Sequence, residues 1–362
     1  MRRTRADVAV VIGVDTHKAT YTASAVTRAG AELATLTVAS DASGHRRLLA
    51  FARHASGPAD AAVPRLWALE GAGSFGCGLT AFLLEQGEAV AEIDRPARPA
   101  RRTGAKTDQL DATRAAREAL ARPPLAEPRC RGTREAVRVL RRTCTGAGRA
   151  KSRAICHLKA LIVTAPRPLR DQLRDQLRGV RDDALLPKCA RLRTTPQHSV
   201  EHRATVTALR LTARRALALE AEADDLESQL EPLVQGLAPH LLAEPGIGVL
   251  TAAELLVAWS HAGRVRSAAA FAQLAGVAPI PASSGQVTRH RLNRGGDRHV
   301  NCALHQIVRS RLGHHVETRA YAAKRTAEGK SPRDIKRCLK RFVARRVFRL
   351  LERPPTEGAP PP

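Results

Sequence analysis

Four acidic residues occupy positions where a metal site for cleaving phosphodiesters could be built. Asp15 follows five consecutive apolar or glycine positions in VVIGVD, and Glu70 ends the apolar segment RLWALE in the same way. Asp108 and Asp111 are three residues apart in TDQLDA, so they share one face of a helix. A carboxylate at the end of a buried strand is costly unless a cation balances its charge. The pattern therefore predicts that the four side chains converge on bound metal.

Two Mg²⁺ ions are the cofactor that such carboxylates predict. One ion would activate the attacking oxygen of the reaction, and the other would stabilise the leaving oxygen of the phosphodiester. Each residue also has an ordinary explanation, because Asp15 could end a strand at a turn, and Asp108 and Asp111 could cap a helix after Thr107. The four residues in this combination and order favour the metal site.

A serine-bearing segment near the C-terminus is a second candidate for chemistry. Ser283 and Ser284 precede Gly285 after an extended stretch that Pro279 and Pro281 impose. A hydroxyl held among guanidinium groups is placed to attack a phosphodiester, whose charge the arginines would absorb. A polar turn in a phosphate-binding loop is the alternative, and the residue pattern alone favours it. The arginines of this segment are Arg289, Arg291, Arg294 and Arg298.

The segment EPGIG at 244–248 is a candidate for gripping the DNA backbone. A turn with Gly246 and Gly248 between two helices presents backbone N–H groups at a helix N-terminus, where a phosphate binds well. It resembles the helix-hairpin-helix element, which holds DNA without reading its sequence. An ordinary glycine-rich helix connection explains the segment equally well.

The order of the predicted elements indicates an α/β N-terminal domain with a ribonuclease-H-like or RuvC-like mixed sheet. In that topology the first and fourth strands are neighbours, which would bring Asp15 and Glu70 together. Alternating apolar residues and glycine turns predict strands, and apolar residues at helical spacing predict helices. The order is three strands within 8–38, a helix at 43–55, a strand at 65–70, a helix at 74–86, a strand at 88–94 and a helix at 107–121.

The rest of the chain is predicted to be mainly helical. Long helical patterns at 132–163 and 200–231 flank a proline-broken stretch at 164–196, and such helices usually pack as a hairpin or coiled coil. We therefore expect four regions: a metal-dependent catalytic domain at 1–125, a helical oligomerisation region at 126–235, a mainly α C-terminal domain with the serine loop at 236–325, and a basic helix with a disordered tail at 326–362.

The net charge of +26 predicts a polyanionic partner. A GC-rich genome would also raise the arginine content, but it would spread arginine evenly. Residues 95–159 instead carry 18 basic against five acidic residues, and residues 289–349 carry 18 against four. Residues 200–258 carry nine acidic and four basic residues. The clustering indicates two nucleic-acid-binding surfaces separated by a self-associating segment.

Disulfides, structural zinc and membrane insertion are not expected. The seven cysteines show neither a C-x-x-C pair nor a ligand-like spacing with histidine. No run of 18 apolar residues occurs, and the N-terminus lacks the features of a signal peptide. We expect a soluble, cytoplasmic protein without a membrane partner.

These segments together resemble the insertion-sequence-110 family of transposases, which includes the Piv-type DNA invertases. The segments appear in the family's order and span nearly the whole chain apart from its middle and its tail. They are GVDTHK (13–18), LEGAGSFG (69–76), KTDQLDA (106–112), EPGIG (244–248), LAGVAPIPASSG (274–285) and RLNRGGDRHVNCAL (291–304).

The resemblance implies a RuvC-like domain with an acidic tetrad at Asp15, Glu70, Asp108 and Asp111, and a nucleophilic serine at Ser284. It implies strand cutting and joining through a covalent serine intermediate in a tetramer. Some members use an element-encoded structured RNA, called a bridge RNA, which pairs with DNA. Two alternatives stay open: a junction-resolving metallonuclease without a serine intermediate, and an inert nucleic-acid-binding protein.

Overall fold

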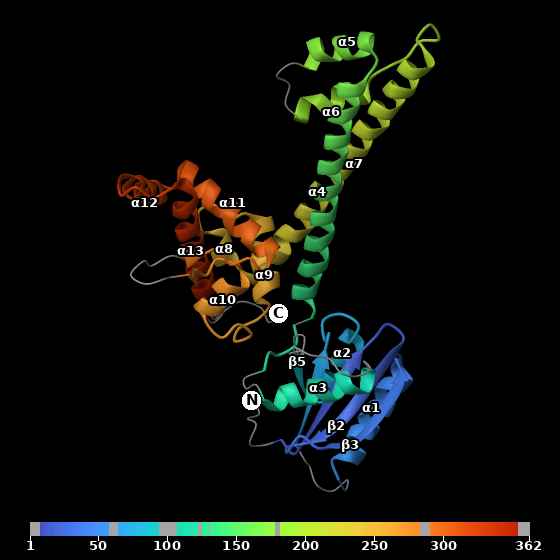
Figure 1. The fold of residues 1–362 in the computed structure, drawn as a ribbon, viewed down its shortest axis with the longest axis vertical. Coiled ribbons are helices and arrows are strands. Elements are labelled where there is room, and N and C mark those ends of the chain that lie inside the picture. The colour runs from blue at the N-terminus through green and yellow to red at the C-terminus, as the bar shows by residue number, and fades with distance from the viewer. Residues whose placement is uncertain are drawn as a thin grey trace. The chain divides into compact units, whose positions relative to one another are not determined.

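The structure is a computed structural model. It describes residues 8–57, 64–93, 107–121, 125–129, 131–177, 182–282 and 290–353. The chain divides into two compact units, residues 1–130 and 131–362 (Figure 1). The four-region division expected from the sequence stays a prediction.

The first unit is a five-stranded mixed sheet with three helices. Its elements are β1 (Val10–Thr16), β2 (Thr20–Thr27), β3 (Glu32–Ala39), α1 (Ala42–Ala55), β4 (Arg65–Glu70), α2 (Cys77–Glu85), β5 (Ala89–Ile93) and α3 (Asp108–Ala121). The strand order is β3-β2-β1-β4-β5. The first three strands pair antiparallel, whereas β1 pairs parallel with β4 and β4 with β5. The predicted element order and the pairing of the first strand with the fourth are confirmed, and the sheet fits a ribonuclease-H-like domain.

Helices cover both faces of this sheet (Figure 1). Successive side chains of a strand point to opposite faces. Ile12 and Val14 therefore join the core formed with α1 and α2, whereas Val11 and Ala68 join the core formed with α3. The α3 residues of that second core are mostly alanines, which allow the helix to approach the strands closely.

Two long helices open the second unit, α4 (Thr133–Thr164) and α7 (Val200–Leu237), and they lie side by side (Figure 1). Lys151 of α4 forms an ion pair with Glu220 of α7. The Cys144 Sγ atom, seven residues earlier, lies 3.8 Å from the carbonyl oxygen of Ala223. Residue numbers rise along one helix as they fall along the other, so the two predicted long helices pack antiparallel.

The proline-broken stretch between the long helices contains two further helices, α5 (Arg167–Leu177) and α6 (Asp182–Ala190). The prolines do not prevent helix formation here, because α6 accommodates Pro187 within its nine residues. Leu169 and Leu173 of α5 and Leu186 of α6 are buried with Leu158 and Leu209 of the long helices. This end of the pair therefore has an apolar core of its own.

The remaining helices of the second unit share one core, and this core includes the final helix of the chain. Ile335, Leu339 and Val347 of the final helix are buried in the same cluster as Trp259 and Phe271. Among the described residues, no helix is both long and apolar enough to cross a membrane. The elements are α8 (Pro239–Leu242), α9 (Val249–Trp259), α10 (Ala268–Leu274), β6 (Ile280–Pro281), β7 (His290–Arg291), α11 (Arg298–His314), α12 (Val316–Ala327) and α13 (Pro332–Leu351).

Candidate active site

The parallel pairing of β1 with β4 brings the ends of these strands to one edge of the sheet. Val14 is the register partner of Leu69, and the Thr16 hydroxyl donates a 2.7 Å hydrogen bond to the carbonyl oxygen of Glu70. Asp15 and Glu70 each follow these partners by one residue. Paired positions of adjacent strands present their side chains to the same face of a sheet, so these two residues share the face that α3 covers.

Gly13 determines how closely α3 approaches that face. A Cβ atom built on Gly13 would lie 2.0 Å from the Ala112 carbonyl oxygen and 2.6 Å from the Ala116 backbone nitrogen. The helix backbone thus occupies the space that any other side chain at position 13 would fill. Because Asp15 lies two residues further along the same face of β1, the first turn of α3 meets it there.

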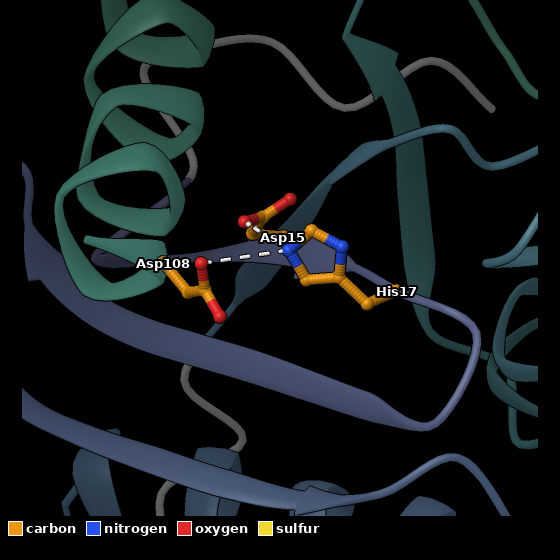
Figure 2. A group of neighbouring side chains, drawn as sticks. All are labelled: Asp15, His17 and Asp108. Atoms are coloured by element: carbon orange, nitrogen blue, oxygen red, sulfur yellow. Dashed lines mark ion pairs between the residues drawn. The ribbon is translucent and has the colours of Figure 1, made fainter. Parts of the chain in front are cut away.

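Asp15, His17 and Asp108 form a cluster in which each residue offers one ligand atom, and these atoms lie within 4.8 Å of one another (Figure 2). His17 Nε2 is 3.2 Å from an Asp15 carboxylate oxygen and 3.5 Å from one of Asp108. Asp15 is only 8% exposed, whereas the His17 and Asp108 side chains are about half exposed. The cluster therefore combines one buried carboxylate with two ligands that solvent reaches.

Asp111 lies close enough to act on the charge of Asp15. Burial raises the pKa of Asp15, and the charges of Asp108 and Asp111 raise it further, whereas His17 lowers it. Asp111 also accepts a 2.9 Å hydrogen bond from Arg114 on its own helix. Asp108 and Asp111 thus both act on Asp15 at the end of β1, and the backbone of Glu70 accepts a hydrogen bond from Thr16 of the same strand.

The serine segment is described only at its two ends. Ile280 of β6 pairs antiparallel with Arg291 of β7. Of the predicted residues, Ser283, Ser284 and Arg289 lie outside the described residues. Arg291, Arg294 and Arg298 are exposed.

The EPGIG turn packs against α11. Gly246 has a φ of +75°, and a Cβ atom there would lie 3.1 Å from the Ile307 carbonyl oxygen. The Arg311 side chain donates a 2.7 Å hydrogen bond to the carbonyl oxygen of Pro245. Gly248 is the N-cap of α9, where its N–H donates to the Thr251 hydroxyl. Packing alone thus explains the glycine at position 246, and phosphate binding by this turn stays a prediction.

Comparison with protein families and known proteins agrees with this arrangement of the chain. The family described as "Transposase IS116/IS110/IS902 family" matches residues 238–323, and the DEDD transposase family of IS110, described as "Transposase", matches residues 12–165. The chain belongs to the IS110 family of transposases. An "Insertion element IS110 uncharacterized 43.6 kDa protein" of Streptomyces coelicolor is 34% identical over 109 residues, which are 29% of this chain and 27% of that relative.

The two IS110-family matches cover both candidate parts of the site. The match at 12–165 contains Asp15, Glu70, Asp108 and Asp111, and the match at 238–323 contains the serine segment and the EPGIG turn. Helix α4 lies within the match at 12–165, whereas α5, α6 and α7 fall between the two matches.

His17 is a candidate ligand of this IS110-family chain that the sequence reasoning missed. The signal was present in GVDTHK, because a residue two positions after Asp15 returns to the same side of an extended chain. Histidine is also a common metal ligand. The sequence does not show that β1 stays extended up to Thr16, which the structure does.

Proposed function

We propose that this chain is a DNA transposase that cuts and rejoins the strands of an insertion sequence. The observation that carries the proposal is the cluster of Asp15, His17 and Asp108 at the end of a ribonuclease-H-like sheet, within the region that matches the DEDD transposases of IS110. A buried carboxylate is retained at such a position when a cation offsets its charge.

The residues present fit a divalent metal site. Oxygen ligands from carboxylates suit Mg²⁺, and the charges that raise the pKa of Asp15 are those a cation would offset. Asp15, Glu70, Asp108 and Asp111 would hold the metal, and their residue types follow the order of the DEDD designation. Two bound Mg²⁺ ions would supply charge stabilisation to the attacking and leaving oxygens of a phosphodiester.

We assign the nucleophile to Ser284. Its Oγ atom would form a bond to phosphorus while the bond from phosphorus to the leaving sugar oxygen breaks, and that oxygen would take up a proton. A second strand's hydroxyl would then displace Ser284, so the number of phosphoester bonds is conserved. Glycine at 285 frees the backbone, which supports projection of the preceding side chain. Arg289, Arg291, Arg294 and Arg298 would stabilise the charge at phosphorus.

Further partners follow from the family resemblance. The proposal includes a homo-oligomer, in which the metal site of one subunit lies beside Ser284 of another, and a bridge RNA that pairs with the DNA. Two basic stretches, 95–159 and 289–349, support the binding of more than one nucleic-acid segment. Gly246 and Gly248 would contact the DNA backbone.

Variants of the two candidate groups test the proposal. Asp15→Asn, Glu70→Gln, Asp108→Asn and Asp111→Asn should each abolish strand cleavage while leaving DNA binding intact, because the basic surfaces are unchanged. Ser284→Ala should abolish the covalent DNA adduct, which mass spectrometry of the digested complex locates, and Ser283→Ala is the matched control.

The outcomes separate the three functions. Metal-dependent cleavage that survives Ser284→Ala without an adduct would indicate a hydrolytic nuclease. Binding without any metal-dependent cleavage in the wild-type chain would indicate an inert DNA-binding protein. An adduct at Ser283 would reassign the nucleophile.

A further inference from the structure

A cavity of about 480 Å³ lies in the C-terminal unit between the β6–β7 ribbon and helices α12 and α13. His290 and Arg291 of β7 line one side, and Arg337, Lys340 and Phe342 of α13 line the other. β6 and β7 are the strands that flank residues 282–289, so the cavity borders the ends of the serine segment. A volume of this size is in the range of small-ligand pockets.

The walls of the cavity are rich in cations. Six arginines and lysines line it, against the single carboxylate of Asp334. Asp334 already pairs with Arg337 at 3.0 Å. Arg291, Lys340 and Arg341 also line the cavity, and no carboxylate of the described residues lies within ion-pair distance of these three side chains. The six cations are Arg291, Arg325, Lys330, Arg337, Lys340 and Arg341.

Two of these cations are half-buried and have no counter-charge among the residues that the structure describes. The Lys340 ammonium donates to the amide oxygen of Asn301, and Arg341 donates to the carbonyl oxygen of Ala268. Burial lowers the pKa of Lys340, and the charge of Arg337 lowers it further. Burial likewise lowers the pKa of Arg341. A bound anion would offset both the burial and the repulsion, so the cavity is built for a negatively charged ligand.

An exposed aromatic ring stands beside these cations. Phe342 is 47% exposed in a chain that contains only six phenylalanines. The Tyr321 ring packs edge-on against the Phe342 ring, with the two ring centroids 5.5 Å apart. The Arg325 guanidinium in turn lies over the Tyr321 ring. Exposure of a large apolar ring is unfavourable in water, and a nucleic-acid base that stacks on the ring would bury it.

We propose that this cavity binds an unpaired nucleotide of a nucleic-acid strand. The base packs against Phe342, and the flanking phosphates lie against Arg291, Lys340 and Arg341. The inference rests on the proposed function in one respect, which is that the chain handles strands opened during recombination. It adds a site that holds a single nucleotide near the serine segment.

Binding of short single strands by the full-length chain tests the proposal without requiring catalysis. The probes are a fluorescent thymidine strand, its ribose counterpart, an abasic strand of equal length and a duplex, measured by anisotropy. Phe342→Ala should weaken binding of the strands that carry bases by about 5- to 150-fold, the usual range for one stacked base. Binding of the abasic strand should not change, and Phe342→Tyr should retain the wild-type affinity.

Control variants separate stacking from a general loss of fold or charge. Val316→Ala removes another exposed apolar side chain, from α12, and should leave all affinities unchanged. Arg291→Gln, at an exposed position, should lower the slope of log K against log salt by about 0.7 for one phosphate contact on a single strand. Thermal unfolding of each variant checks that the fold is retained.

Equal binding of base-bearing strands by the wild type and Phe342→Ala would overturn the proposal, as would an equal loss with the abasic strand. A preference for ribose or for deoxyribose supports it and identifies which strand occupies the cavity. Base-dependent binding in a chain that never forms a DNA adduct would refute the serine mechanism and leave the nucleotide site standing.

Discussion

Substitution of Gly13 by alanine should move α3 away from the sheet and weaken the proposed metal site without changing any of its candidate ligands. The new Cβ atom would lie 2.0 Å from the Ala112 carbonyl oxygen, whereas Cβ atoms essentially never approach another heavy atom closer than 3.0 Å. Since the obstacle is backbone, the helix must retreat by about 1 Å, with an overpacking cost of about 1–3 kcal/mol. That displacement carries Asp108 and Asp111 away from Asp15.

The effect on catalysis should exceed the effect on stability. Metal sites tolerate deviations of about 0.2 Å in ligand distance, and a 1 Å misplacement typically costs about 100-fold in rate. Calorimetric titration with Mn²⁺ should show weakened binding by Gly13→Ala, and cleavage should fall by about two orders of magnitude. Gly78→Ala is the matched control, because its nearest neighbour is a His45 ring carbon at 3.5 Å. Wild-type metal affinity in Gly13→Ala would refute the argument that the close approach of α3 builds the site.

Three further predictions concern stability and binding. Burial lowers the pKa of His45 in the folded protein. The stability that neutral His45 contributes is therefore full above about pH 6.5 and is lost as the pH falls through the lowered pKa. His45→Phe should flatten this part of a plot of unfolding free energy against pH. Glu254 is 1% exposed and lies 3.2 Å from Arg141. Glu254→Ala should lower the free energy of unfolding, measured by urea denaturation, by about 3–5 kcal/mol, because it leaves the Arg141 charge unpaired. A loss below about 1 kcal/mol would contradict a buried ion pair. Arg294→Gln should lower the salt slope of duplex-DNA binding by about 0.9, and an unchanged slope would place Arg294 away from DNA.

Most of the N-terminal fold could be predicted because its central strands are buried and short turns connect the first three strands. Burial of both sheet faces forces apolar runs such as VVIGVD, and the glycine at position 30 takes a φ of +90° in the turn between β2 and β3. Helices α5 and α6 could not be predicted in the same way. Proline signals a break in isolation, but Pro187 is tolerated where the packing of Leu186 and Cys189 stabilises the helix.

The acidic strand end could be recognised as a candidate from the sequence because the cost of burying a charge restricts which residues can occupy such a position. Asp15 is conspicuous against its apolar neighbours, and its position on β1 predicts that of Glu70 on β4. What the sequence did not show is the docking of α3, since the contact between Gly13 and Ala112 joins residues about one hundred positions apart.

The serine segment has no comparable burial constraint. This difference explains why the sequence leaves two adjacent candidates for the nucleophile. A hydroxyl in a polar segment is compatible with solvent, so neither Ser283 nor Ser284 carries a burial cost that would require a partner. The nearby cavity behaves differently, because Lys340 is a half-buried charge whose partner is the amide oxygen of Asn301. The physical reasoning that singled out Asp15, a buried negative charge, therefore applies to Lys340 with the sign reversed. It supports the two proposed sites, a cation site in the first unit and an anion site in the second, and a protein that moves DNA strands would use both.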